Sequence, residues 1–158
     1  LIVLPDATAK PLLAAMDGAQ RSLRIKMFLF SDPGLLQSAI AAKKRGVDVR
    51  VMLNPARRSG ESENEDSRRK LVEAGVSVLD SNPAFDLTHE KSMVVDDAEA
   101  YVMSLNWETR NVTETRDYAI VTRSSLDWYL KQHPRAAAPQ LLTSLEKTDN
   151  APSTAFPS

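Results

Sequence analysis

Five residues at fixed spacing in the second half of the chain have the side chains that phosphate chemistry needs. His89, Lys91 and Asp96 lie within eight residues of one another, and Ser104 and Asn106 follow shortly after. On a β-strand, His89 and Lys91 are two positions apart and therefore point to the same face. That face would offer an imidazole nucleophile beside an ammonium group that can hold a phosphate oxygen. The pattern therefore indicates phosphoryl transfer.

Hydrogen-bond donors for such a site follow in the next segment. If residues 99–105 pair antiparallel with residues 91–96, the chain returns beside His89 at Ser104 and Asn106. A hydroxyl and an amide at this place could bind the charge that develops on the non-bridging phosphate oxygens. The sequence therefore predicts a phosphate-binding set of Lys91, Ser104 and Asn106.

The combination of residues is more informative than any of its parts. A single histidine near a strand is more often structural than catalytic, and a His-x-Lys pair by itself carries little information. Five specified residues at fixed offsets, however, would match by chance roughly once in several million positions at average composition. The joint pattern favours a functional site.

Alternating helices and strands would have to position these residues. Asp32 and Pro33 have the types of a helix cap and a first helical turn, and Gly46 is typical of the position after a helix. Hydrophobic periodicity predicts helices over residues 8–22, 31–45 and 67–74, strands over residues 23–30, 47–53, 76–79, 91–96, 99–105 and 116–122, and a loop over residues 54–66. We expect an α/β domain with a mixed, largely parallel β-sheet flanked by helices on both faces.

Composition sets broad limits on the domain organisation. The 158 residues are 42% hydrophobic and 26% charged, as in a soluble globular protein. We predict a catalytic domain over residues 1–123, a helical C-terminal extension over residues 124–147 and a disordered tail over residues 148–158. No apolar run approaches the roughly 20 residues of a transmembrane segment. Because the chain begins at Leu1 and not at Met, sequence upstream could be missing, and the compartment, cytoplasmic or exported, stays unassigned.

Charge and residue types disfavour several other functions. A net charge of −1 lacks the basic excess that dedicated nucleic-acid binders usually carry. With no cysteine and two histidines, a zinc site is improbable, and the five isolated glycines form no phosphate-binding glycine loop. We therefore predict no metal and no cofactor.

The spacing resembles a known family motif. His89-x-Lys91-x4-Asp96, followed by Ser104-x-Asn106, is similar to the H-x-K-x4-D motif of the phospholipase D superfamily. The segments at residues 45–51 and 74–76 also resemble the frame of that family, so the resemblance covers about residues 1–123.

The resemblance implies a mechanism and roles for residues. His89 would attack phosphorus and form a covalent phosphohistidine, while a histidine from a second motif would protonate the leaving oxygen. Lys91 and Asn106 would bind phosphate with Ser104 nearby, whereas Asp96 is more often a structural member of the motif. An acidic residue after the asparagine orients the histidine in this family. Asp117 stands where that residue is expected, and Glu114 is the alternative.

The sequence departs from the family pattern at two points. Met103 precedes Ser104, where the family usually has glycine, and only one motif is present. The other histidine, His133, has no lysine two residues later and is best interpreted as a loop residue. A complete site therefore requires a second motif, supplied by a homodimer partner or by a second half absent from this chain.

Three functions remain open at this stage. The first is a metal-independent phosphodiesterase acting on a phospholipid headgroup, by hydrolysis or by transfer to an alcohol. The second is a homodimeric, single-motif endonuclease of the same superfamily, which the chain's size favours and its charge disfavours. The third is a non-catalytic member, for which Met103 and the missing second motif are the support.

Overall fold

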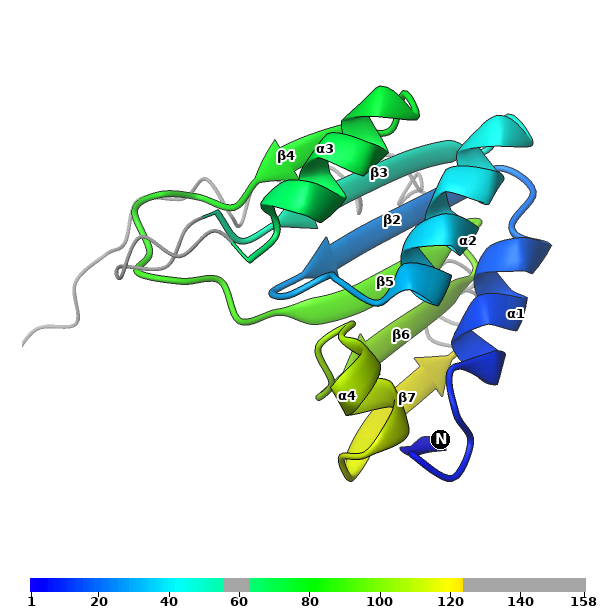
Figure 1. Cartoon of the computed structure of the whole chain (residues 1–158). Coiled ribbons are helices and arrows are strands. Elements are labelled where there is room, and N and C mark those ends of the chain that lie inside the picture. Colours follow the sequence, from blue (N-terminus) through cyan, green and yellow to red (C-terminus); the bar gives the residue numbers. More distant parts are fainter. Residues whose placement is uncertain (56–62, 124–158) are drawn as a thin grey trace, which may run out of the picture. The chain divides into compact units, whose positions relative to one another are not determined.

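A seven-stranded mixed sheet organises the fold (Figure 1). The computed structural model describes residues 1–55 and 63–123, and Leu1–Arg123 form one compact unit. The predicted C-terminal extension and tail lie outside the described residues. The elements in chain order are β1 (Ile2–Leu4), α1 (Lys10–Gly18), β2 (Ser22–Met27), α2 (Pro33–Lys44), β3 (Asp48–Leu53), α3 (Glu65–Glu73), β4 (Ser77–Asp80), β5 (Lys91–Val95), β6 (Glu99–Met103), α4 (Thr109–Thr113) and β7 (Asp117–Thr122).

The sheet combines a parallel part with an antiparallel part. Its strand order is β1-β7-β6-β5-β2-β3-β4. Strands β2, β3 and β4 pair in parallel, and the remaining neighbours pair antiparallel. The predicted α/β class with a mixed sheet is confirmed, and parallel pairing is confined to these three strands. The reason is chain length, because parallel neighbours need a crossover helix such as α2 or α3, whereas β5 and β6 are joined by a tight turn.

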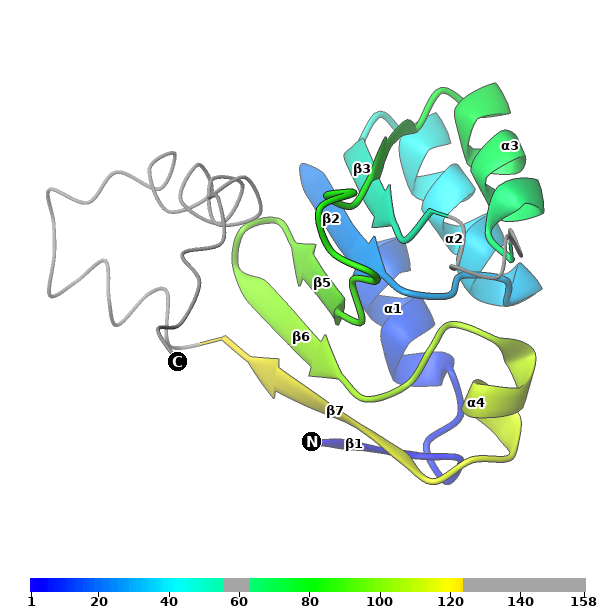
Figure 2. The same ribbon diagram turned by 90° about the vertical axis from the view of Figure 1, so that its left-hand side faces the viewer.

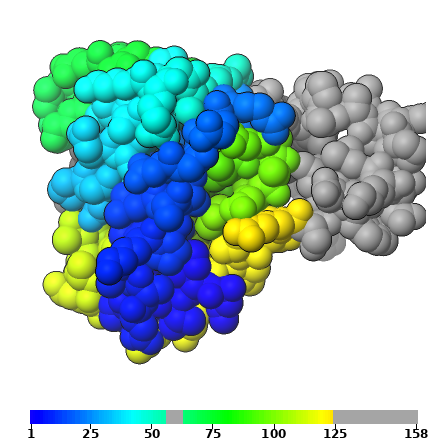
Figure 3. Space-filling view, turned by 90° about the vertical axis from the view of Figure 1, so that its right-hand side faces the viewer, coloured from blue at the N-terminus to red at the C-terminus, as the bar shows by residue number. Residues whose placement is uncertain are grey.

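Three helices cover one face of the sheet. Figures 1 and 2 show α1, α2 and α3 on the same side, and Figure 3 shows α1 and α2 lying alongside each other. The sequence predicts helices on both faces, whereas in the described residues these three lie on one face. Strand side chains on the opposite face are more open, with Val102 60% and Ile120 61% exposed.

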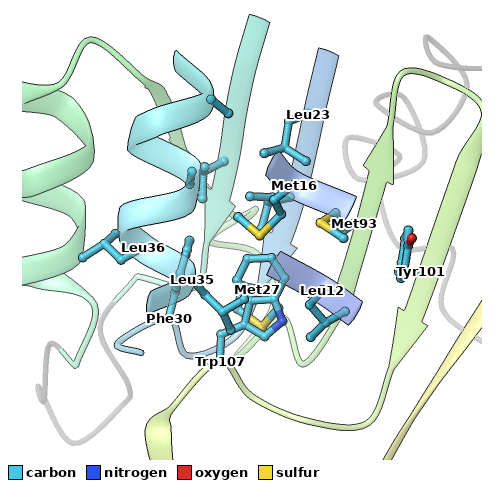
Figure 4. Close-up of a cluster of buried hydrophobic side chains, with 14 of the residues drawn as sticks. Leu12, Met16, Leu23, Met27, Phe30, Leu35, Leu36, Met93, Tyr101 and Trp107 are labelled. Atoms are coloured by element: carbon cyan, nitrogen blue, oxygen red, sulfur yellow. The ribbon is translucent and has the colours of Figure 1, made fainter. Parts of the chain in front are cut away.

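The hydrophobic core fills the space between helices and sheet. Strand residues alternate, so Leu23, Ile25 and Met27 of β2 are all buried against the helices. Figure 4 shows Leu12 and Met16 of α1 within the same cluster. In the described ranges, no helix is long and apolar enough to cross a membrane.

The sequence signals at α2 correspond to its two ends. The Asp32 carboxylate accepts a hydrogen bond from the Leu35 amide at 3.0 Å, and Pro33 occupies the first turn. Gly46 follows the helix with a φ of 95°, a conformation that glycine adopts without strain. Strand β1 and helix α4 were missed, because elements of three and five residues are too short to show a period.

The hairpin of β5 and β6 brings the second group of polar residues towards His89. Ser92 pairs with Val102, so the predicted antiparallel pairing is confirmed. Asp96 and Asp97 have φ values of 54° and 57°, and the Ala98 amide donates to the Val95 carbonyl at 3.0 Å. These are the features of a type I′ turn, and because Val95 pairs with Glu99 the loop between the strands has three residues. The turn fixes the register that leads the chain back to the start of β5.

Candidate active site

The candidate site lies where the parallel strands end. Lys91, the first residue of β5, pairs with Met27, the last residue of β2, and His89 precedes it by two positions. Asn54 follows the neighbouring strand β3. Open α/β sheets commonly bind ligands beyond the carboxyl ends of their strands.

His89 and Lys91 are in direct contact. The Lys91 ammonium lies 3.0 Å from Nδ1 and 2.9 Å from Nε2 of His89, and it donates to the His89 carbonyl at 3.1 Å. Because the lone pair of a ring nitrogen lies in the ring plane, one ammonium near both nitrogens satisfies at most one of them. Contacts with the ring and with the backbone carbonyl of His89 thus hold the Lys91 ammonium beside the imidazole.

Burial and charge together favour an uncharged imidazole. Burial, followed by the charge of Lys91, holds the pKa of His89 below its usual 6.5. Burial also lowers the pKa of Lys91 from 10.5, while the charge of Asp117 acts in the opposite direction. Lys91 is 6% exposed, and its sheet neighbour Met27 is 2% exposed, which accounts for the desolvation. At neutral pH the imidazole is therefore mostly uncharged and keeps one ring-nitrogen lone pair, which is what a nucleophile needs.

Phe28 forms an aromatic contact that the sequence analysis did not assign to the site. Its ring meets the His89 ring edge-on, with centroids 4.7 Å apart, and the Lys91 nitrogen lies 5.6 Å from its centroid. The sequence signal was available, because an aromatic residue directly follows the alternating strand β2. Phe28 limits the positions open to the imidazole.

Ser104 and Asn106 lie on the segment that follows β6. The Ser104 hydroxyl donates to Asp117 Oδ1 at 2.6 Å and accepts from the Tyr118 amide at 3.0 Å. The Asn106 amide nitrogen donates to Glu108 at 3.2 Å, and among the described residues its buried Oδ1 has no hydrogen-bond partner. Asn106 therefore retains hydrogen-bonding capacity, whereas the Ser104 hydroxyl is engaged by Asp117.

Asp117 is part of a small hydrogen-bonded group beside Lys91. Burial raises its pKa, but hydrogen bonds from Ser104, Thr115 and Asn111, with the charge of Lys91, bring it below 3.8. Within the described part of the chain no hydrogen bond joins Asp117 to His89, so the orienting role assigned to it stays a prediction.

Glu114, the alternative to Asp117, lies elsewhere. Its carboxylate is 4.0 Å from Arg110 one helical turn away, and its side chain is 69% exposed. That arrangement is typical of a solvent-facing ion pair. Of the two acidic candidates, Asp117 is the one whose charge acts on Lys91.

Asp96 lies at the opposite end of β5 from His89. Its carboxylate accepts backbone N–H bonds from Gln20 at 2.9 Å, Arg21 at 2.7 Å and Ser22 at 2.9 Å. These bonds keep its pKa below 3.8 although burial acts the other way. A five-residue strand separates the two ends by about 16 Å. The structure therefore brings His89 and Lys91 together, but not Asp96.

Comparison with known proteins assigns the family. A family profile described as "Cardiolipin synthase, PLD-like domain" matches residues 12–135, which is most of the chain. This chain belongs to the phospholipase D-like family. Two relatives are mitochondrial cardiolipin hydrolases. The Xenopus laevis protein is 30% identical over 123 residues (74% of this chain, 54% of that protein), and the human protein is 31% identical over 118 residues (74% and 45%). The chain spans about half the length of the curated relatives it matches.

Solved structures show the same fold. A phospholipase D family member, Nuc from Salmonella typhimurium, is similar with a TM-score of 0.68 at 24% identity, over 82% of this chain and 87% of that one. NucT from Helicobacter pylori is similar with a TM-score of 0.66 at 15% identity, over 90% and 94%. The expected phospholipase D-like fold is confirmed.

Met103, the departure from the phospholipase D pattern, lies beside Lys91. Because Ser92 pairs with Val102, Met103 and Lys91 are the next pair towards the site, and Met103 is 7% exposed. Its side chain therefore lies among the buried residues of the sheet, where it adds to the apolar surroundings of Lys91. It does not occupy the open side of the sheet.

Trp107, next to Asn106, is a packing residue. It is fully buried and its ring meets Phe30 edge-on at 4.8 Å. Its amide donates to the Leu29 carbonyl at 2.9 Å, and its carbonyl accepts from the Ser31 amide at 2.7 Å. The structure assigns Trp107 to the core, where it anchors the segment that carries Asn106.

Proposed function

We propose that this chain supplies one half of a metal-independent phosphodiesterase of the phospholipase D type, acting through a covalent phosphohistidine on a phospholipid headgroup. The observation that carries the proposal is the contact between Lys91 and His89, whose pKa is lowered, at the carboxyl ends of the parallel strands. The similarity to cardiolipin hydrolases supports a phospholipid as the substrate.

The proposed chemistry has two displacement steps. A ring nitrogen of His89 attacks phosphorus, and the bond from phosphorus to the leaving oxygen breaks as that oxygen takes a proton from the second motif's histidine. Water or an alcohol then attacks phosphorus, gives its proton to that second histidine and releases His89. Lys91 and the Asn106 amide bind the non-bridging oxygens, with Ser104 nearby and Asp117 tuning the group.

The second histidine must come from another motif. His133 lies outside the described residues, and the described part contains one imidazole, that of His89. We infer a homodimer partner or a second half as its source, since a two-fold axis through the site would place two H-x-K motifs face to face. The oligomeric state in solution tests this directly, and a stable dimer would make one motif sufficient.

Replacement of the nucleophile tests the function. We expect His89→Ala to lower the conversion of cardiolipin in vesicles to phosphatidic acid and phosphatidylglycerol by more than about 10³-fold, in buffer containing EDTA. The same substitution at the other histidine, His133→Ala, is the matched control and should keep wild-type turnover. Wild-type protein denatured at alkaline pH during turnover, where the N–P bond survives, should carry the phosphatidyl group, and His89→Ala should not. Full activity in His89→Ala would overturn the proposal.

One alternative is a homodimeric endonuclease. A short chain with a single H-x-K-x4-D motif favours it, although the net charge of −1 opposes it. Single-stranded DNA with EDTA separates the two, because cleavage of DNA without lipid turnover would assign the nuclease. A strictly monomeric protein that turns over neither substrate and traps no phosphate on His89 would instead be a non-catalytic member.

A further inference from the structure

Two buried asparagines lie behind the catalytic histidine. Asn54 is 3% and Asn64 is 5% exposed; Asn54 directly follows strand β3, and Asn64 directly precedes helix α3. Burying a primary amide is costly unless its donors and acceptor find partners. Where these amides place their hydrogen bonds therefore shows what they hold in place.

Asn64 joins the chain ends beyond β2 and β3. Its Oδ1 accepts from the Phe30 amide at 2.9 Å. Its Nδ2 donates to the Phe28 carbonyl at 2.8 Å and to the Asn54 carbonyl at 3.0 Å. One side chain thus replaces the sheet hydrogen bonds that end with these strands, and it fixes the backbone of Phe28, whose ring contacts His89.

Asn54 continues the connection to the segment that precedes β5. Its Oδ1 accepts from the Thr88 amide at 2.8 Å, and its Nδ2 donates to the Pro55 carbonyl at 3.2 Å. Thr88 is the residue immediately before His89, and this segment has no regular secondary structure. The bond from Thr88 therefore holds backbone that no strand pairing holds.

We infer that Asn54 and Asn64 are positioning residues that set the orientation of the His89 imidazole against Lys91. Asn64 acts through Phe28, which contacts the imidazole ring, and Asn54 acts through Thr88, which holds the backbone of His89. Both asparagines act through other residues and bind no substrate. The expected effect on turnover rests on the proposed function. The orientation of the His89 ring can be measured whether or not the protein is active.

A pair of substitutions at Asn54 isolates the bond to Thr88. Asn54→Ala removes the acceptor, whereas Asn54→Asp keeps an oxygen at the same place. With bis(4-nitrophenyl) phosphate as a soluble probe, we expect Asn54→Ala to lower kcat about 10- to 100-fold with KM nearly unchanged, because small displacements of reacting groups cost about this much. Asn54→Asp should recover most of the loss. The His89 ring resonances, assigned with His89→Ala, should shift in Asn54→Ala and return in Asn54→Asp.

Ser38→Ala is the matched control for stability. The Ser38 hydroxyl is buried and donates to Asp17 at 2.6 Å, which joins α2 to α1 away from the site. This variant should lose thermal stability while it keeps both kcat and the His89 resonances. A variant that only weakens the fold behaves in this way.

The inference is overturned if Asn54→Ala behaves like Ser38→Ala, or if Asn54→Asp loses as much kcat as Asn54→Ala. If Asn54→Ala does not fold, Asn54→Ser takes its place, since its hydroxyl is too short to reach the Thr88 amide. A wild-type protein without phosphodiesterase activity would refute the proposed function. The comparison of His89 resonances would then still decide the role of Asn54.

Discussion

The two ends of β5 carry polar groups of opposite character. At its start, the Lys91 ammonium lies within 3.0 Å of both ring nitrogens of His89, and burial lowers the pKa of each group. At its finish, the Asp96 carboxylate accepts three backbone N–H bonds, and these lower its pKa against the effect of burial. Desolvation disfavours the charged forms of the groups at the first end, whereas backbone hydrogen bonds stabilise the charge of Asp96 at the second.

The difference explains the spacing of the motif. The four residues between Lys91 and Asp96 belong to β5, so this spacing is the length of one strand. The aspartate marks the turn that starts the return strand, and that strand carries Ser104 and Asn106 towards the site. One short pattern therefore combines the two residues of the candidate site, His89 and Lys91, with Asp96 at the turn that leads into β6.

The largest effect is expected at the reactive end. Lys91→Met should lower kcat/KM for a phosphodiester about 100-fold, or about 2.7 kcal/mol, because a buried phosphate-binding charge is lost. The same change should raise the pKa of His89 towards 6.5, since one of its two causes disappears, while burial keeps it below that value. NMR titration of the His89 ring measures the shift, and an unchanged pKa would contradict the contact between the two side chains.

An intermediate effect is expected at the structural end. Asp96→Ala should lower the free energy of unfolding by about 1–3 kcal/mol, because three backbone donors lose a charged acceptor. Since folding lowers the pKa of Asp96, this stabilisation is present above about pH 3.8 and disappears as the pH falls through the folded-state pKa. Urea unfolding at pH 7 and pH 3 should show the difference between wild type and variant shrinking. A loss of kcat as large as that of Lys91→Met, in folded protein, would show that the two ends are not separate.

The smallest effect is expected inside the turn. Asp97 has a φ of 57°, and in the part of the chain that the structure describes its buried Oδ1 has no partner. Asp97→Gly should therefore raise the free energy of unfolding by about 0.5–1 kcal/mol, because glycine tolerates this conformation and suits the second position of a type I′ turn. Thermal unfolding provides the measurement, and kcat should not change. A lower melting temperature would mean that the Asp97 carboxylate contributes to the hairpin.

Local patterns predicted the elements with regular periods. The cap at Asp32, the glycine at Gly46 and the alternation of β2 and β3 all depend on neighbouring residues, and each corresponds to an observed element. The pairing of β5 with β6 followed from the same local reasoning. Helix α3 begins at Glu65, two residues before the predicted start, because an acidic first turn carries little hydrophobic signal.

The contacts of the site residues were less predictable. Ser104 was predicted to bind phosphate, yet its hydroxyl is engaged by Asp117, a residue 13 positions away. Asn54 and Asn64 gave no signal at all, because an asparagine in a polar loop looks the same whether it is buried or exposed. Such roles depend on partners that are distant in sequence, which periodicity does not record.

The sequence by itself determined the family of this protein and its candidate site: a histidine and a lysine two positions apart, an aspartate one strand later and a family frame around them. Only the tertiary structure decided how that chemistry is held. It placed His89 against Lys91 and Phe28, separated Asp96 from the site, and buried two asparagines behind the imidazole. The reason is physical, because residue types and spacings are properties of the local chain. Burial and hydrogen-bond partners arise when strands that are distant in sequence become neighbours in one sheet.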